Sequence, residues 1–409
     1  MTGILAACGG GGSGVDSSPV TATGYFLDSK VEGLDYIGDK GATGSTGVEG
    51  DFKYLPDETM TFSLGDLPIG SASGQTVVTP QSLIATNLTP DEQLQVVENI
   101  VRLIIAVDEN TNPDDGIVVS ETLTAELTDA IDLQTTDLDG AVLGLAIAGT
   151  LPTVAEAEEH FTETLLCSFS GAFHGNWSTV DFSGLTGMII DAKGKIYGMA
   201  SDGQGISSDS TLAAVFEGNR TVDFVTNAFN ASGDWYAITR EAGGLVDNYV
   251  LTGEQINVAG DFESADVVSG TLSKDGIAGV MDAQRVDSNF DSAYRFTGLA
   301  YEEVEDNGVI VRVPIPIFLF TFNIDENNQV TGSGVLLEGS VLFSLTGTVV
   351  NGQITALVES NEGHARITGD INLDAGTMSD LVWTVVDNNG VVIVDGGNGI
   401  AIGSGCSLR

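Results

Sequence analysis

Two stretches decide the fold of this chain: residues 190–198 read Ile-Asp-Ala-Lys-Gly-Lys-Ile-Tyr-Gly, and residues 324–332 read Ile-Asp-Glu-Asn-Asn-Gln-Val-Thr-Gly. Both place glycine or asparagine three residues after an aspartate and two residues before a β-branched residue. Glycine and asparagine tolerate the positive φ that a tight hairpin turn requires. Each stretch therefore predicts a β-hairpin, with Gly194 and Asn328 in the turns.

A second pair of similar stretches extends the strand pattern. Gly-Thr-Leu at 270–272 precedes Asp-Gly at 275–276, and Gly-Thr-Val at 347–349 precedes Asn-Gly at 351–352. The two pairs have offsets of 134 and about 76 residues, so they are not one duplication. We expect a meander of hairpins, closed as one or two antiparallel barrels or sandwiches, with domains at 166–288 and 289–409.

The most apolar run of this region is Val-Pro-Ile-Pro-Ile-Phe-Leu-Phe at 313–320. Such a run is typical of a strand that is buried on both faces, with the prolines at its edge. The alternative is that the run lines an apolar ligand cavity or contacts lipid.

Residues 20–86 contain short runs of alternating polarity, separated by glycine and acidic turns, which predict a small antiparallel β-sandwich. The runs are 23–27, 34–37, 51–55 and 60–64. With Gly-Tyr-Phe-Leu-Asp-Ser at 24–29 and Gly-Val-Glu-Gly-Asp-Phe at 47–52, this region resembles the carboxypeptidase-regulatory or transthyretin-like β-sandwich of bacterial surface lipoproteins. The resemblance implies a structural spacer or a binding platform without catalytic residues.

Residues 87–165 change to a helical period. Thr89, Pro90 and Glu92 form the pattern of a capping box, and apolar residues then recur on one face to about Val107. Shorter helical patterns follow at 122–131 and 153–165. We expect a helical connector, so the predicted fold class is mainly β: a small sandwich, a helical connector and a large antiparallel β region.

The composition indicates a folded chain with an acidic surface. Of 409 residues, 58 are Asp or Glu and 14 are Lys or Arg, which gives a net charge of −44, while 42% are hydrophobic. Nucleic acid as a partner is excluded, because phosphate binding requires clustered Lys and Arg.

The N-terminal stretch 1–19 carries a localisation signal. Leu-Ala-Ala-Cys at 5–8 resembles the lipobox of Gram-negative bacterial lipoproteins, and the glycine-rich run at 9–14 is typical of a flexible tether. The resemblance implies that Cys8 is lipidated, that the chain is held to a membrane by this anchor, and that Gly9 directs it to the outer membrane, on the periplasmic or the outer face. Only seven residues precede Cys8, so we expect a complete secretion signal to begin upstream.

Two cysteines remain after Cys8, at the two ends of the C-terminal β region. An oxidising compartment favours a disulfide between Cys167 and Cys406, which we expect to join the first strand to the last. Two free buried thiols are the alternative.

One loop has the composition of a cation site. Residues 108–116 read Asp-Glu-Asn-Thr-Asn-Pro-Asp-Asp-Gly, with oxygen donors at the alternate positions Asp108, Asn110, Asn112 and Asp114. Such donors suit Ca²⁺, and the loop resembles an EF-hand-like or dockerin-like loop, although Pro113 replaces the glycine expected at the sixth position. The alternative is an Asx-rich loop that ends a helix.

Common catalytic motifs are absent from the sequence. The three histidines lack the His-Glu-x-x-His spacing, and no Gly-x-Ser-x-Gly or Walker motif occurs. Glu156 and His160, four residues apart, could share a metal ion, but a solvated helix face is the simpler interpretation.

The predicted function is a lipid-anchored cell-envelope protein, a non-catalytic binding or adhesion module for a surface, glycan or protein ligand. A barrel that carries a small apolar ligand or lipid, and an extracellular hydrolase with an unrecognised carboxylate site, are the alternatives.

Overall fold

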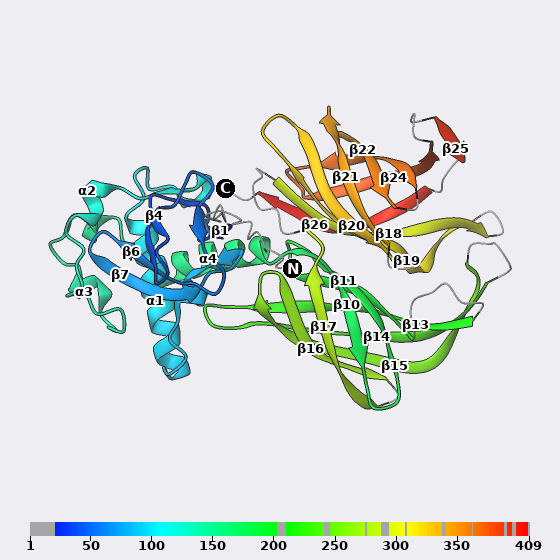
Figure 1. Cartoon of the computed structure of the whole chain (residues 1–409), viewed down its shortest axis with the longest axis horizontal. Helices are drawn as coiled ribbons and strands as arrows, with labels where there is room; N and C mark the ends of the chain where they lie inside the picture. The colour runs from blue at the N-terminus through cyan, green and yellow to red at the C-terminus, as the bar shows by residue number, and fades with distance from the viewer. Residues whose placement is uncertain are drawn as a thin grey trace, which may run out of the picture.

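The computed structural model describes residues 21–202, 210–240, 246–274, 276–287, 294–306, 309–337, 341–361, 363–387, 391–394 and 398–407. The chain is mainly β: small N-terminal sheets are followed by a helical segment and two eight-stranded antiparallel barrels (Figure 1). The predicted fold class is confirmed, and the C-terminal region forms two barrels.

The N-terminal region is a sandwich of two small sheets, ordered β5-β1-β8 and β4-β3-β6-β7. Phe26 and Phe52 of the first sheet pack on Phe62 of the second, with ring centroids 5.0 and 5.2 Å apart. The pairing is not wholly antiparallel, because β8 runs parallel to β1 and β9 runs parallel to β2. The strands are β1 (Ala22–Phe26), β2 (Val31–Glu32), β3 (Asp35–Gly38), β4 (Thr43–Ser45), β5 (Asp51–Tyr54), β6 (Thr59–Leu64), β7 (Leu67–Ser73), β8 (Val77–Val78) and β9 (Ile117–Val118).

Two long helices dominate the connector, and each begins with a capping box. Thr89 and Glu92 cap α1, as the sequence predicts, and Thr153 and Glu156 cap α4 in the same way. The helical pattern at 122–131 yields only one short turn, because the side chains of Thr128 and Asp132 accept bonds from nearby backbone amides and favour turns instead. The helices are η1 (Pro80–Leu83), α1 (Pro90–Ala106), η2 (Pro113–Asp115), α2 (Glu121–Thr124), α3 (Leu138–Ala141), η3 (Ala146–Gly149) and α4 (Val154–Ser168).

One hydrophobic core runs through both the sandwich and the helices. Phe62 of the sandwich, Ile100 of α1 and Phe161 of α4 belong to the same buried cluster, which also includes Phe224 of the first barrel. The ring of Phe161 stacks on that of Phe224 with centroids 5.8 Å apart. Helix α4 thus connects the N-terminal core to the barrels.

The first barrel closes where β10 pairs with β17, in a register from Phe173–Arg285 to Ser178–Val280. Its interior is filled by buried side chains that include Trp177, Phe216 and Trp235. Its strands are β10 (Gly171–Ser178), β11 (Ser183–Ile190), β12 (Lys195–Asp202), β13 (Ser210–Val222), β14 (Asn227–Arg240), β15 (Val246–Ser264), β16 (Val267–Lys274) and β17 (Ile277–Arg285).

The second barrel is an eight-strand ring that runs from β18 to β24 and closes through β26, while β25 pairs only with β24. At the seam between β24 and β26, the described pairs in register are Leu381–Gly399 and Val382–Asn398. Its strands are β18 (Tyr294–Asp306), β19 (Val309–Ile324), β20 (Gln329–Leu336), β21 (Val341–Val350), β22 (Gln353–Ser360), β23 (His364–Asn372), β24 (Thr377–Val386), β25 (Val392–Val394) and β26 (Asn398–Ser407).

The two repeated stretches form equivalent hairpins, one in each barrel. Gly194 turns β11 into β12 with φ of 72°, and Asn328 turns β19 into β20 with φ of 59°, so both predictions are confirmed. In each turn an aspartate side chain accepts two backbone amides: Asp191 from residues 193 and 195, and Asp325 from residues 327 and 329. The aspartate of the shared pattern therefore stabilises the turn.

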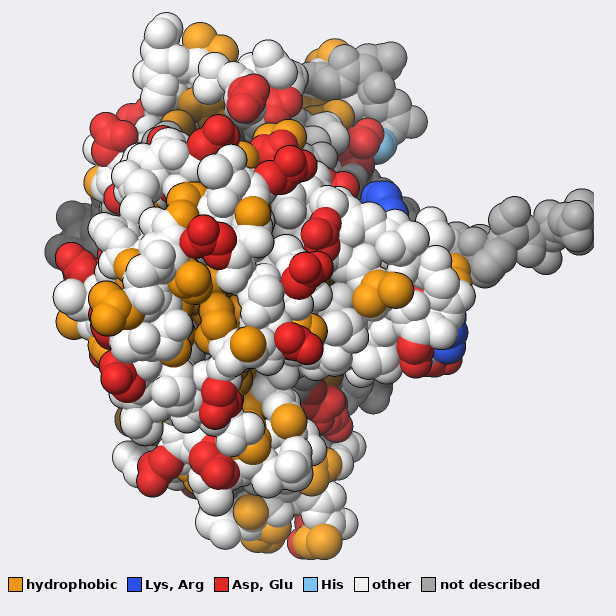
Figure 2. All heavy atoms as spheres, turned by 90° about the vertical axis from the view of Figure 1, so that its left-hand side faces the viewer, with side chains coloured by type: hydrophobic (Ala, Val, Ile, Leu, Met, Phe, Trp, Pro, Cys, Tyr) orange, Lys and Arg blue, Asp and Glu red, His pale blue; other side chains and the backbone are white. Residues whose placement is uncertain are grey.

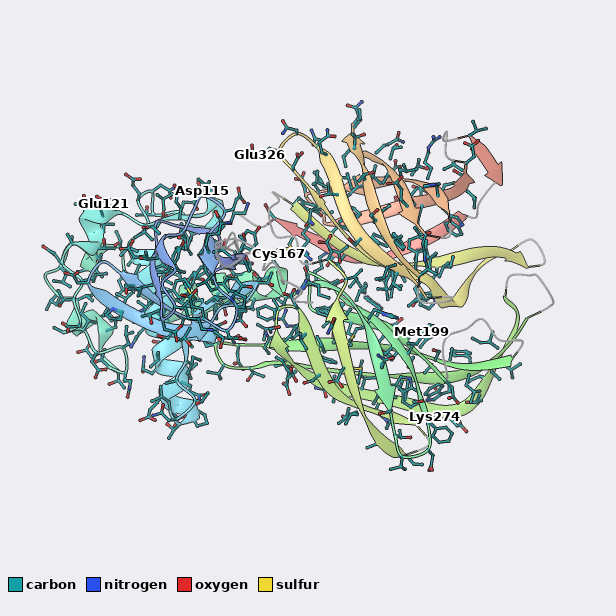
Figure 3. All side chains as sticks on the ribbon, viewed as in Figure 1. Asp115, Glu121, Cys167, Met199, Lys274 and Glu326 are labelled. Atoms are coloured by element: carbon teal, nitrogen blue, oxygen red, sulfur yellow. A yellow bond between two sulfur atoms is a disulfide. The ribbon has the colours of Figure 1, made fainter. Side chains whose placement is uncertain are left out.

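The barrels pack against each other through their outer faces. Ile189 and Met199 of the first barrel belong to one buried cluster with Leu319 and Val335 of the second. Met199 is labelled in Figure 3. Phe318 and Phe320 face the interior of the second barrel, and Leu319 between them is buried in the cluster between the barrels, so this end of the apolar run is a strand buried on both faces.

The N-terminal part of the molecule shows scattered Asp and Glu side chains with few Lys or Arg on the face in Figure 2. Among the described residues, no helix combines the length and the apolar character that crossing a membrane requires.

Candidate functional site

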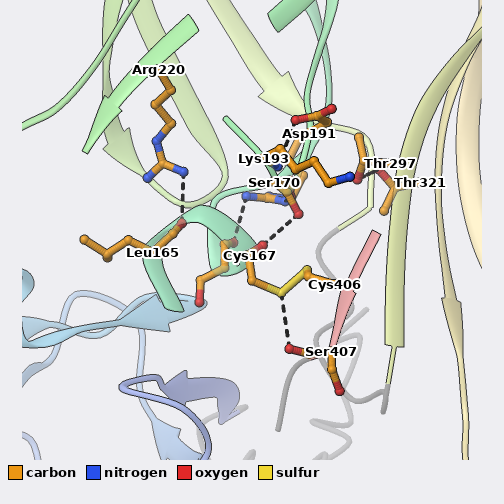
Figure 4. The surroundings of a disulfide bond; sticks show 12 residues. Leu165, Cys167, Ser170, Asp191, Lys193, Arg220, Thr297, Thr321, Cys406 and Ser407 are labelled. Atoms are coloured by element: carbon orange, nitrogen blue, oxygen red, sulfur yellow. Dashed lines mark hydrogen bonds between the residues drawn. A yellow bond between two sulfur atoms is a disulfide. The ribbon is translucent and has the colours of Figure 1, made fainter. Parts of the chain in front are cut away.

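The expected disulfide between Cys167 and Cys406 is present, with Cα atoms 5.9 Å apart (Figure 4). The expected position of one partner was wrong, because Cys167 lies in the last turn of α4 and not on a strand. The disulfide therefore joins the connector helix to β26, the last strand of the second barrel.

Two buried arginines join the same helix end to the first barrel. Arg220 of β13 donates to the carbonyl of Leu165 at 2.9 Å, and Arg285 of β17 donates to the carbonyls of Ser168 and Ser170. Arginine at a helix C-terminus satisfies carbonyls that lack helical partners and complements the helix dipole. Burial lowers the pKa of Arg220 to about 9, so this side chain stays charged at neutral pH.

The predicted calcium ligands are only partly brought together. Asp108 is fully buried, and its two carboxylate oxygens accept the backbone amides of Asn112 and Val118 at 2.8 and 3.0 Å. Asn110 also accepts from the amide of Asn112, and Asp114 lies in η2. These bonds are those of an Asx-rich loop, and within the described residues no cluster of three or more His, Cys, Asp or Glu could hold a metal ion. Calcium binding stays a prediction.

His160 contacts a buried carboxylate of the sandwich. Its Nε2 lies 3.5 Å from Oδ1 of Asp28, while Glu156 is engaged with Thr153 in the helix cap. Asp28 is fully buried, and within the described part of the chain neither of its oxygens accepts a hydrogen bond. Burial raises the pKa of Asp28 to about 6, against the opposing effect of His160.

The predicted lipidation site, Cys8, lies outside the described residues.

An apolar pocket of about 290 Å³ opens at one end of the second barrel. It lies where β20, β22 and β24 end and where β23 begins, so its walls come from strands that are distant in sequence. The lining residues are Ile317, Phe318, Leu336, Phe343, Val358, Ser360, Gly363, His364, Ala365, Ile367, Trp383 and Val385, which together we call the barrel mouth.

Three aromatic rings give the barrel mouth its shape. Phe318 meets Phe343 at 5.9 Å and 84°, and it meets Trp383 at 6.3 Å and 87°. Edge-to-face arrangements of this kind are favourable and fix the ring positions. Trp383 is only half-buried, whereas Trp177 and Trp235 of the first barrel are 1% and 0% exposed. An exposed aromatic surface thus remains inside a concave site.

A stack of phenylalanines forms the floor beneath Phe318 of the barrel mouth, whose ring lies 5.7 Å from that of Phe320. The rings of Phe320 and Phe322 lie 5.9 Å apart at 2°, and Phe296 stacks on both within 6.1 Å. All three side chains are buried. The pocket is therefore shallow, and the rest of the barrel interior is packed.

A larger cavity of about 610 Å³ lies at the junction of the sandwich, α4 and both barrels. Its lining mixes Lys30, Lys193, Asp114 and Glu163 with the disulfide. Lys30 is already paired with Glu49, and Lys193 donates to the carbonyl of Ala375. Because the barrel mouth combines concavity with a coherent apolar lining, it is the better candidate for a small-molecule site.

The sequence indicated only one wall of this site. The apolar-cavity alternative for 313–320 included Ile317 and Phe318, which do line the mouth. Phe343, His364 and Trp383 were not identified, because an inward residue near a barrel end shows the same alternation as one in a packed core. Cross-strand register brings the lining residues together, as in the pairs of Phe343 with Ser360 and of Ile367 with Trp383.

No protein-family model matches this chain. No curated protein matches it either. Among solved structures, a variant of transferrin-binding protein B from Haemophilus parasuis is 10% identical with a TM-score of 0.18, and the match covers 58% of this chain and 75% of that one. Aeromonas veronii immune modulator A is 7% identical with a TM-score of 0.18, covering 56% and 93%. Transferrin-binding protein B of Neisseria meningitidis is 9% identical with a TM-score of 0.17, covering 49% and 62%. At these TM-scores the likeness carries no argument about the ligand of this chain.

Proposed function

We propose that this chain is a lipid-anchored, non-catalytic binding protein of the bacterial cell envelope, and that the barrel mouth binds the apolar part of its ligand. Cys8 holds the anchor, the glycine-rich tether separates it from the folded part, and the sandwich with its helices presents the barrels.

The concave, aromatic-lined barrel mouth is the observation that supports this function. The pocket of about 290 Å³ combines an almost wholly apolar lining with three aromatic rings at the end of an otherwise filled barrel. Ligand sites are typically apolar clefts with a few polar groups, and Ser360 and His364 provide those groups here.

Binding can be tested with the uncharged fluorescent probe N-phenyl-1-naphthylamine. We expect saturable binding to the full chain, with the emission of Trp383 quenched as the probe enters. Ala365→Phe fills the mouth with a ring and should weaken binding at least tenfold. Leu342→Phe is the matched control, because Leu342 is 62% exposed next to Phe343 and faces the opposite side of β21.

Two results would overturn the proposed site. Equal binding by the wild type and Ala365→Phe would place the probe elsewhere. No saturable binding by the wild type would remove the small-molecule function. Circular dichroism of both variants establishes that a loss of binding is not a loss of fold.

The anchor is tested separately. The chain is expressed with a complete secretion signal, and Cys8→Ser is compared with the wild type in washed membrane fractions. We expect Cys8→Ser to become soluble in the periplasm or the medium. Equal membrane retention of both forms would contradict the anchor and would leave the barrel mouth unaffected.

A further inference from the structure

We infer that the barrel mouth selects a compact, uncharged aromatic molecule and rejects fatty acyl chains and organic anions. This inference rests on the proposed function and names the ligand class of the same site. Three features of the described residues support it: the floor, the geometry of the rings and the distribution of charge.

The floor limits the length of the ligand. Phe296, Phe320 and Phe322 fill the barrel directly beneath Phe318, and they are 0%, 3% and 1% exposed. An extended acyl chain would have to displace this stack and expose rings whose burial stabilises the fold. A pocket of about 290 Å³ lies at the lower limit of small-molecule sites. The site therefore accommodates a short, wide molecule and not a long chain.

The walls favour an aromatic ligand. Phe343 and Trp383 both stand nearly perpendicular to Phe318, so an added ring continues the edge-to-face pattern with any of them. A rigid ring system also loses little conformational entropy when it is immobilised, unlike an alkyl chain. Among compact apolar molecules, aromatic ones should therefore bind most tightly.

The charges disfavour an anion. None of the twelve described lining residues is a lysine, an arginine or an acid, so a buried ionised group would find no counter-charge in the mouth. The one lining imidazole, His364, has Nδ1 3.6 Å from Oε1 of Glu359 on the neighbouring strand. The net charge of −44 adds a repulsive field for every anion that approaches.

The experiment uses two matched probes and one homologous series on the full chain. N-phenyl-1-naphthylamine and 8-anilino-1-naphthalenesulfonate have the same aromatic skeleton and differ by a sulfonate. We expect the uncharged probe to bind at least tenfold more tightly in 0.1 M NaCl. Linear alcohols from butanol to dodecanol then compete with the uncharged probe. Each methylene should improve competition about fourfold until the mouth is full, and longer chains should gain nothing further.

The outcomes separate this inference from the proposed function. If the two probes bind with equal affinity and Ala365→Phe abolishes the binding of both, then the barrel mouth is the binding site but does not reject anions. If competition by the alcohols with the uncharged probe improves steadily up to dodecanol, the barrel mouth does not exclude acyl chains. Absence of saturable binding of the uncharged probe would overturn both the function and the inference. Leu342→Phe again controls for probe bound to the outer surface.

Discussion

The two barrels have the same strand number and the same up-and-down order, yet their equivalent ends differ. At the end where the first strand turns into the second, the first barrel is filled: Lys274 lies over the rings of Phe182 and Trp235 at 3.8 and 5.3 Å and pairs with Asp202 (Figure 3). The corresponding end of the second barrel is the barrel mouth. The same barrel fold thus has a packed end in the first copy and a candidate binding site at the equivalent end of the second.

The barrels also differ in how they are closed and attached. Among the described residues, six pairs are in register between β10 and β17 of the first barrel, and two between β24 and β26 of the second. The first barrel binds the end of α4 through Arg220 and Arg285, and the second through the disulfide at Cys406. The barrel that carries the candidate site is therefore held to the helix by a covalent bond, and the packed barrel by hydrogen bonds from two buried arginines.

The largest effect should come from removing the disulfide. It closes a loop with a sequence separation of 239, for which the chain-entropy model gives a stabilisation of about 4 to 5 kcal/mol. In the double variant Cys167→Ala with Cys406→Ala, we expect hydrogen exchange to accelerate more in β24 and β26, next to the lost bond, than in β10 and β17. Uniform acceleration in both barrels would contradict the difference in attachment.

Replacement of one tryptophan in each barrel should lower the unfolding free energy by very different amounts. Trp235→Ala leaves a cavity in a packed core and should cost about 3 to 5 kcal/mol of unfolding free energy. Trp383→Ala removes a half-buried wall of the barrel mouth and should lower the unfolding free energy by only about 1 kcal/mol. The same change should abolish the quenching of tryptophan emission that accompanies probe binding. Urea unfolding followed by circular dichroism measures both free energies. Similar costs would mean that the mouth is as tightly packed as the core of the first barrel.

A smaller, pH-dependent effect should arise in the N-terminal unit that carries both barrels. The pKa of Asp28 is raised from 3.8 to about 6 in the folded state, so folding favours its protonated form. Its favourable contribution is complete below pH 4 and is lost as the pH rises through about 6, by at most about 3 kcal/mol.

Asp28→Asn should therefore be more stable than the wild type at pH 7.5 and equal to it at pH 4. The difference in unfolding free energy between the two proteins isolates Asp28 from the other carboxylates. If the difference in unfolding free energy between the two proteins is the same at pH 4 and at pH 7.5, then ionisation of Asp28 does not destabilise the folded state. His160 or solvent would then stabilise the charged carboxylate. Probe binding at the barrel mouth should not change in this variant, because Asp28 is not among its lining residues.

The features that the sequence predicted are those that neighbouring residues determine. Thr89 and Glu92 lie within one helical turn, and Gly194 and Asn328 each determine one hairpin, so local chemistry was sufficient. The disulfide was predictable from the count and position of cysteines, but not the helical setting of Cys167. The barrel mouth was not predictable, because Phe343 and Trp383 meet Phe318 only through barrel closure. The same applies to Lys274, a charged residue that only tertiary packing could bury.

A stability effect smaller than those of the disulfide, Trp235 and Asp28, and the most direct test of the comparison, should come from opening the filled end of the first barrel. Lys274 is 2% exposed, and its stem and ammonium group cover Phe182 and Trp235. Lys274→Ala removes this cover, and we expect a loss of about 1 to 2 kcal/mol, since the cation–π contacts and the pair with Asp202 are lost together. Trp235 should then become accessible to acrylamide, and the uncharged probe should gain a second, weaker site that Ala365→Phe does not block. Lys195→Ala, which alters an exposed lysine of the same barrel, should change neither property. If Lys274→Ala leaves Trp235 protected and binds no additional probe, then the strands of the first barrel, and not its lysine, close that end, and the difference between the barrels lies in their backbones.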